Sequence, residues 1–105
     1  MSEANVRHYA RIARASDDYL AGAASLEVTI STLEGLIAAL EDISPDLRNQ
    51  FLARWGLLED LYATSLDQPE RRLIEINRDR LRVAVAEIRD AAYRRAGGAG
   101  SDDRT

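Results

Sequence analysis

His8 is the single side chain of this sequence that ordinarily titrates near neutral pH, the property that acid–base catalysis most often uses. It lies between Arg7 and Arg11, and the chain contains no His-x-x-x-His or Glu-x-x-His pair. Polar groups without partners generally face water, so we expect His8 to be a solvated surface residue. The missing Glu-x-x-His pair is the one that di-metal carboxylate bundles need, and we predict no metal site.

The residue types that carry most other chemistry are also missing. Without cysteine, the chain has no disulfide, no thiolate ligand for zinc and no cysteine nucleophile. Gly22, Gly35 and Gly56 are isolated within helical patterns, so they do not form a phosphate-binding loop. We therefore predict a protein that is not an enzyme and has no cofactor.

Charge is distributed unevenly along the chain. Residues 16–67 contain ten acidic residues and two arginines, whereas residues 68–96 contain eight arginines and five acidic residues. An acidic region of this kind steers the approach of a basic protein. We predict that such a partner binds through seven acidic residues, which are Glu27, Glu34, Glu41, Asp42, Asp46, Glu59 and Asp60.

Two sets of charged residues have helical spacing. Glu27, Glu34 and Glu41 recur every seven residues, and a set of arginines falls within about 40° on one side of a helix, at 100° per residue. These arginines are Arg71, Arg78, Arg82 and Arg89. The two stripes either form ion pairs between helices or are solvated separately, and this interpretation competes with a binding surface.

The overall composition disfavours two classes of partner. The chain has a net charge of −4 and a pI near 4.9, so its field repels phosphate and a nucleic-acid partner is not expected. No apolar run approaches the roughly 18 residues that a membrane-spanning helix needs, and we expect a cytoplasmic protein. All 14 basic residues are arginine, which indicates codon bias in a GC-rich, bacterial genome.

The elements that position these residues are helices, because the apolar residues recur at alternating spacings of three and four. We predict an all-α fold with main helices at 17–43, 45–66 and 69–96. The short connections make consecutive helices antiparallel, so the predicted architecture is a three-helix bundle. Residues 3–14 either form a shorter additional helix or continue into the first long one.

Three short segments mark predicted helix ends. Ser44-Pro45-Asp46 has an N-cap residue followed by proline in the first helical position. Asp67-Gln68-Pro69-Glu70 has the spacing of a capping box, and Gly97-Gly98 ends the last helical pattern. The predicted organisation is a basic N-terminal segment, a bundle domain and a disordered tail, over residues 1–15, 16–96 and 97–105.

Two residues test the predicted core. Trp55 stands at helical spacing with Phe51, Leu58 and Tyr62, so we expect a shielded indole whose replacement by alanine costs roughly 3–5 kcal/mol. Asn77 is the one polar residue at the centre of an apolar stripe, and we expect a buried amide that fixes the helix register.

The second predicted helix carries the pattern Phe51-x-x-x-Trp55-x-x-Leu58-Glu59-x-x-Tyr62-Ala63-x-x-Leu66. This pattern, which covers residues 51–66, resembles one found in small helical proteins of GC-rich bacteria. Some of those proteins resemble the immunity proteins of polymorphic toxin systems, which commonly set an acidic surface against a basic toxin. The resemblance implies a toxin as the basic partner.

The first functional hypothesis is therefore a non-enzymatic protein-interaction module that binds a basic protein. One alternative is a helical protein that forms a homodimer through the leucines around its second predicted helix. These leucines are Leu52, Leu57, Leu58, Leu61 and Leu66. A second alternative is a small helical enzyme with an arginine-lined groove.

Overall fold

A computed structural model describes residues 3–41, 43–66 and 77–98 of the chain. All regular structure within these ranges is helical, which confirms the all-α class. The helices are α1 (Glu3–Leu20), α2 (Leu26–Ala38), α3 (Pro45–Leu66) and α5 (Arg78–Tyr93), and a π-helical turn, η1 (Arg94–Gly98), follows α5.

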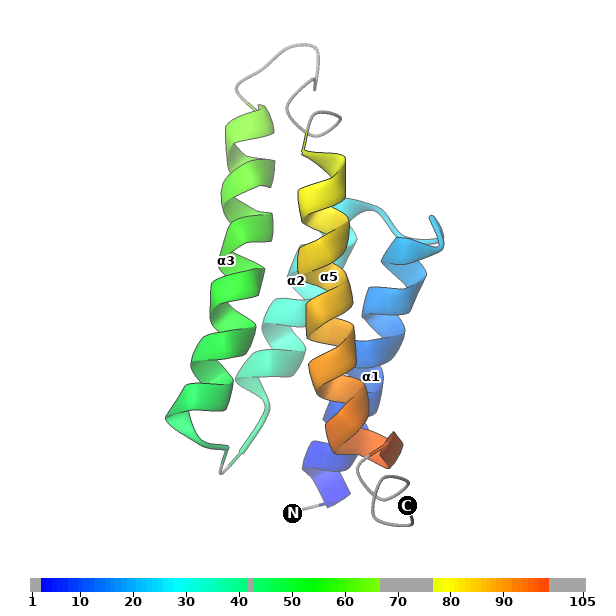
Figure 1. Cartoon of the computed structure of the whole chain (residues 1–105), viewed down its shortest axis with the longest axis vertical. Coiled ribbons are helices and arrows are strands. Elements are labelled where there is room, and N and C mark those ends of the chain that lie inside the picture. Colours follow the sequence, from blue (N-terminus) through cyan, green and yellow to red (C-terminus); the bar gives the residue numbers. More distant parts are fainter. Residues whose placement is uncertain (1–2, 42, 67–76, 99–105) are drawn as a thin grey trace.

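The four helices of the described ranges pack side by side with alternating direction (Figure 1). α1 packs against α2 and α5, and α3 packs against the same two helices, so the order around the bundle is α1, α2, α3, α5. The predicted three-helix bundle is therefore not confirmed. The structure has two helices where the sequence analysis placed one long helix at 17–43, and α1 crosses the predicted boundary between residues 15 and 16.

The chain reverses between α1 and α2 because of two local features. Gly22 has a φ of 82°, a left-handed conformation that side chains with a Cβ adopt only with strain. Ser25 then caps α2, since its hydroxyl accepts a hydrogen bond from the Val28 N–H at 3.2 Å. Together they end one helix and begin the next within five residues.

The start of α3 agrees with the sequence analysis. The Ser44 hydroxyl accepts a hydrogen bond from the Leu47 N–H at 3.1 Å, and Pro45 occupies the first helical position. The capping box predicted at 67–70, the predicted start of the third helix at 69, and residues 99–105 of the predicted tail lie outside the described residues. α5 ends at Tyr93, before the predicted end at 96, and Gly97 and Gly98, where the tail was predicted to begin, belong to η1.

The core lies between all four helices. Tyr9 of α1 and Phe51 of α3 are each 1% exposed, and their ring centroids lie 6.3 Å apart. The predicted apolar stripes supply most of the remaining core. Its large, fully buried aliphatic residues are Ile12, Leu33, Ile37, Leu58, Leu81, Val85 and Ile88.

Asn77 differs from its prediction. It stands immediately before α5 and is half-buried, and its side-chain oxygen accepts a hydrogen bond from Arg80 Nη1 at 3.3 Å. α5 begins at Arg78, and the apolar periodicity of the sequence, which continues on both sides of Asn77, does not reveal this start. An asparagine at this junction does not have the surroundings of a buried amide inside a helix.

Candidate protein-binding face

Glu27 and Glu34 are the acidic residues of α2, and both are exposed. They are seven residues apart, about 10 Å along the helix, and both lie on the side that carries Ile30. That side faces α3, because the Ile30 carbonyl accepts a hydrogen bond from the Trp55 indole at 3.0 Å. Glu41 follows the end of α2, so the predicted seven-residue stripe does not extend to it on this helix.

Glu41 is held by its backbone in the connection between α2 and α3. The Asn5 side-chain oxygen accepts a hydrogen bond from the Glu41 N–H at 2.9 Å, and the Asn5 amide donates one to the Glu41 carbonyl. Asn5 is 4% exposed, while the side chain of Glu41 is exposed. Asp42 lies outside the described residues.

The acidic residues of α3 lie on two sides of that helix. Glu59 is one turn after Trp55 and therefore lies on the side toward α2. Asp60 is three residues after Leu57, which faces α5, and Asp46 is one turn before Gln50, which also faces α5. All three carboxylates are exposed. The predicted set thus divides into an α2–α3 group, Glu27, Glu34 and Glu59, and separate residues near the ends of α3.

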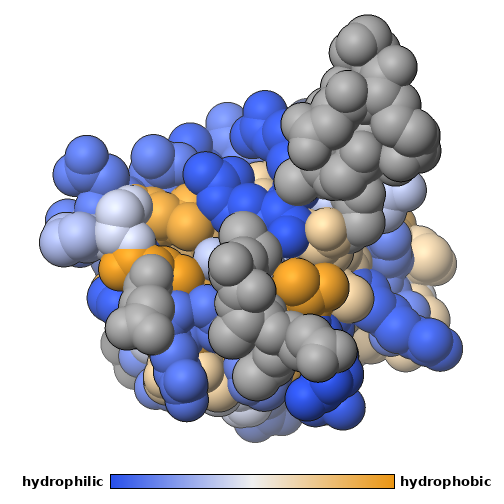
Figure 2. Space-filling view, turned by 90° about the horizontal axis from the view of Figure 1, so that it is seen from below, coloured by the Kyte–Doolittle hydropathy of each residue, from blue (hydrophilic) through white to orange (hydrophobic). Residues whose placement is uncertain are grey.

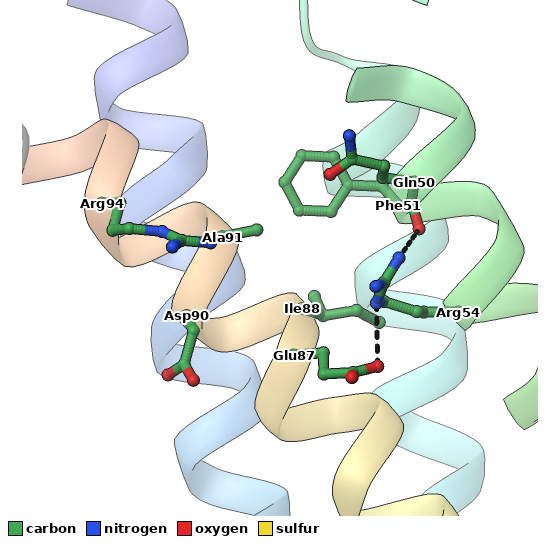
Figure 3. Close-up of a pocket in the computed structure, with 8 residues that line it drawn as sticks. All are labelled: Gln50, Phe51, Arg54, Glu87, Ile88, Asp90, Ala91 and Arg94. Atoms are coloured by element: carbon green, nitrogen blue, oxygen red, sulfur yellow. Dashed lines mark hydrogen bonds and ion pairs between the residues drawn. The ribbon is translucent and has the colours of Figure 1, made fainter. Parts of the chain in front are cut away.

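The two arginines of α3 do not neutralise the α2–α3 group. Arg54 Nε lies 2.9 Å from Glu87 Oε1 on α5, and its Nη1 donates to the Gln50 carbonyl (Figure 3). Arg48 donates from Nη2 to the Leu40 carbonyl at 3.0 Å. Within the described ranges, no ion pair reaches Glu27, Glu34 or Glu59.

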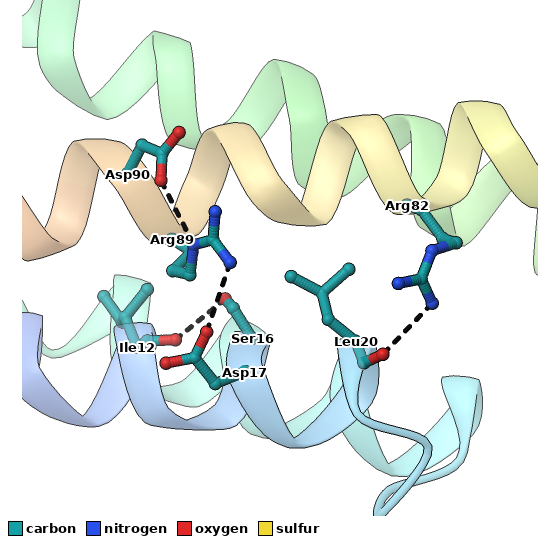
Figure 4. A network of polar contacts seen from close by, with 7 residues as sticks. All are labelled: Ile12, Ser16, Asp17, Leu20, Arg82, Arg89 and Asp90. Atoms are coloured by element: carbon teal, nitrogen blue, oxygen red, sulfur yellow. Dashed lines mark hydrogen bonds and ion pairs between the residues drawn. The ribbon is translucent and has the colours of Figure 1, made fainter.

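Two arginines of α5, Arg82 and Arg89, face α1. Arg82 donates to the Leu20 carbonyl at 3.1 Å, where the negative end of the α1 dipole favours a cation (Figure 4). Arg89 lies 3.4 Å from Asp17 of α1 and 3.1 Å from Asp90. The hydrogen bond to Asp90 is the main reason that the pKa of Arg89 is raised above its ordinary value.

This arrangement corrects one interpretation of the charged stripes. Arg82 and Arg89 make contacts with α1, not with the glutamates of α2, since α5 packs between α1 and α3. Arg78 is exposed, and Arg71 lies outside the described residues. The exposed carboxylates of α2 are therefore not the partners of the arginine stripe.

Two further sequence expectations concern chemistry. His8 is half-buried, with a shielded Nδ1 that has no hydrogen-bond partner among the described residues, so it is not the solvated side chain expected. The arginine-lined groove has a counterpart in a hollow of about 240 Å³ between α3 and α5, lined in part by Arg54 and Arg94. In that hollow the Arg54 guanidinium already pairs with Glu87.

Among the residues that the structure describes, no cluster brings together three residues able to ligate a metal ion, and no helix is long and apolar enough to cross a bilayer. At the end of the bundle that carries the α2–α3 connection, hydrophilic side chains cover most of the visible surface, and the apolar areas between them are small and separate (Figure 2).

The leucines proposed for self-association are partly withdrawn into the fold. Leu58 is fully buried, Leu57 and Leu61 are half-buried, and Leu52 is 42% exposed. The side chain of Leu66 is not among those described. Comparison of the chain with protein-family models, curated proteins and solved structures finds no significant match.

Proposed function

We propose that this protein is an interaction module that binds a basic protein through the α2–α3 group, Glu27, Glu34 and Glu59. The observation that carries the proposal is that these carboxylates are exposed and lack ion-pair partners within the described ranges, while Arg48 and Arg54 are engaged elsewhere. An uncompensated acidic side attracts a basic surface from a distance.

The distribution of charge over the bundle supports this proposal. Residues 26–66 contain seven acidic residues and two arginines, whereas residues 78–98 contain six arginines and three acidic residues. α2 and α3 are neighbours in the bundle, and Glu27, Glu34 and Glu59 lie toward their contact, so these three carboxylates act on the same side of the molecule. Glu41, Asp46 and Asp60 are exposed as well and add to the negative charge of this part of the molecule.

We expect these carboxylates to increase the rate of association with a basic partner more than the affinity. Exposed ion pairs contribute roughly 0–1 kcal/mol each because water and salt screen them. A field of one sign nevertheless accelerates encounter with an oppositely charged partner, and this acceleration falls as ionic strength rises. Among basic proteins, a toxin is the class that the resemblance of residues 51–66 to immunity proteins implies.

An oligoarginine peptide is a suitable probe of this face. Stopped-flow association at low salt should slow about threefold for Glu34→Arg and about tenfold for Glu27→Arg with Glu34→Arg, because the peptide then meets like charge. At high salt the differences should vanish.

Asp18→Arg is the matched control. Asp18 is exposed on α1, makes no ion pair within the described ranges, and its reversal changes the net charge by the same amount. It should slow association much less than Glu34→Arg does. If the two variants slow it equally, the peptide senses only net charge, and the assignment to the α2–α3 group is wrong.

A further inference from the structure

A shallow groove runs along the contact between α3 and α5, on a different side of α3 from Glu59. It consists of two hollows of about 390 and 240 Å³ that share Arg54 and Glu87 as lining residues. Ala53, Leu57 and Val83 contribute to the apolar lining of the larger hollow. The smaller hollow is backed by apolar residues, which are Phe51, Ile88 and Ala91.

The two ends of the groove carry opposite charges at similar distances from its centre. Asp79 precedes Glu87 by eight residues and Arg94 follows it by seven, so each lies about 10–12 Å from Glu87 along the helix axis. Neither makes an ion pair within the described residues. The linings of both hollows together hold three arginines and three acidic residues.

An apolar side chain stands beside this groove. Val83 is 57% exposed, although it belongs to the lining of the larger hollow. It precedes Glu87 by four residues, and Ala91 of the smaller hollow follows Glu87 by four. Val83 and Ala91 therefore lie at equal distances on either side of the Arg54–Glu87 pair.

We propose that the groove is the interface between two copies of this chain, related by a two-fold axis near the Arg54–Glu87 pair. Such an axis places the two α5 helices antiparallel. Asp79 of one copy then lies beside Arg94 of the other at both ends, and Val83 of each copy covers the hollow at Ala91 of the other. A two-fold interface requires this self-complementarity.

Charge selects a second copy over a basic partner. With three arginines and three acidic residues, the groove has no net charge that would attract a basic protein, whereas a second copy offers an acid for Arg94 and a base for Asp79. From Asp79 to Arg94 the groove is only about 22 Å long. An interface this short buries a modest area, so we expect a dimer that dissociates on dilution.

Sedimentation of the full chain over a range of concentrations tests the proposal. The wild type should associate at high micromolar concentration, and Asp79→Arg and Arg94→Asp should each weaken association at least tenfold, because each places like charges at both ends of the interface. An equimolar mixture of the two variants should associate again, since every end then joins opposite charges.

The controls keep folding and net charge apart from the interface. Asp18→Arg and Arg14→Asp make the same charge changes on the exposed surface of α1, and both should associate as the wild type does. Circular dichroism should show all variants folded. A wild type that stays monomeric to millimolar concentration, or a mixture that fails to recover association, would overturn the proposal. Neither result bears on oligoarginine binding, which uses the α2–α3 group.

Discussion

Asn5 is the residue that joins the start of α1 to the connection between α2 and α3. Its amide pairs with both the N–H and the carbonyl of Glu41, as a residue of a neighbouring strand would. Neither Glu41 group belongs to a helix, so each would otherwise need another partner. An asparagine near a chain end gives no sequence signal for this role, and the sequence analysis did not single it out.

Replacement of Asn5 by alanine should lower the free energy of unfolding by about 2 kcal/mol, because the N–H and the carbonyl of Glu41 both lose their partner. Urea unfolding followed by circular dichroism measures the change. Asn5→Asp keeps the acceptor for the Glu41 N–H but not the donor, and should also destabilise. An Asn5→Ala variant as stable as the wild type would contradict the docking of Glu41.

Trp55 is less deeply buried than its spacing predicts. It is half-buried against the core, and its indole N–H donates to the Ile30 carbonyl. We expect Trp55→Phe to cost about 1 kcal/mol through loss of this hydrogen bond, and Trp55→Ala to cost about 3 kcal/mol through lost packing as well. Thermal unfolding measures both changes. Tryptophan emission as red-shifted in the folded protein as in urea would show that the contact with α2 is absent.

The buried hydroxyl of Tyr9 makes the stability of the fold depend on pH in the alkaline range. Burial raises the pKa of its hydroxyl above the ordinary value of 10.0, and it outweighs the opposing effects of Arg95 and Arg48. In the unfolded chain the phenol ionises first, so its contribution to stability is full below about pH 10 and is lost as pH rises through the folded-state pKa.

The free energy of unfolding should therefore fall above about pH 10, and it should fall less steeply in Tyr9→Phe, which has no proton to lose at this position. Urea unfolding at a series of alkaline pH values measures both slopes. Burial also raises the pKa of Tyr19. Tyr19 should therefore cause part of the loss of stability that remains in the Tyr9→Phe variant. Equal slopes in the two proteins would mean that Tyr9 ionises as easily in the fold as outside it.

At the scale of elements, capping residues in the sequence predict where a helix begins. They do not predict which helices pack against one another. α3 begins and ends where the sequence analysis placed it, because Ser44 and Pro45 set its start by contacts within one turn. Ser25 caps α2 in the same way, although the predicted helix at 17–43 runs through it.

The candidate site could be predicted only in part, for a related reason. Exposure of Glu27, Glu34 and Glu59 follows from their positions beside the apolar stripes. Which charged stripe faces which helix depends on the order of helices around the bundle, and no spacing along one helix contains that information. Arg82 and Arg89 accordingly contact Leu20 and Asp17 of α1, residues that the predicted helix at 17–43 joined to Glu27 and Glu34.

Gly22 and Gly56 occupy different backbone environments, the first in a turn and the second within a helix. Gly22→Ala should cost about 1 kcal/mol or more, because its φ of 82° is strained for alanine. Gly56→Ala should stabilise by about 0.5–1 kcal/mol, because Gly56 lies within α3 and an added Cβ meets no atom within 4 Å. Thermal unfolding should therefore shift in opposite directions. A shift in the same direction would show that one of the two backbone conformations is wrong.

At the scale of the molecule, α1 contributes to the core as the other helices do. Tyr9 and Ile12 are almost completely buried, and α1 packs against both α2 and α5. The first fifteen residues also contain Asn5, which holds the α2–α3 connection. The predicted basic N-terminal segment is thus part of the packed bundle in structural terms, although Arg7, Arg11 and Arg14 remain exposed.

A chain that begins at residue 16 should therefore fail to fold cooperatively. The deletion removes Tyr9, Ile12 and Ala13 from the core, and it opens the ring of helices between α2 and α5. Loss of a buried Tyr or Ile side chain alone costs about 2–5 kcal/mol, and a small domain is stabilised by only about 5–15 kcal/mol.

Circular dichroism during heating tests this deletion against the full chain. The shortened chain should retain some helical signal yet lack a sigmoidal transition, because helices without a packed core unfold gradually. Adding the peptide of residues 1–15 in excess should restore part of the transition, since it supplies the missing core residues. A shortened chain that unfolds as sharply and at the same temperature as the full chain would mean that residues 16–96 fold on their own, as the sequence analysis expected.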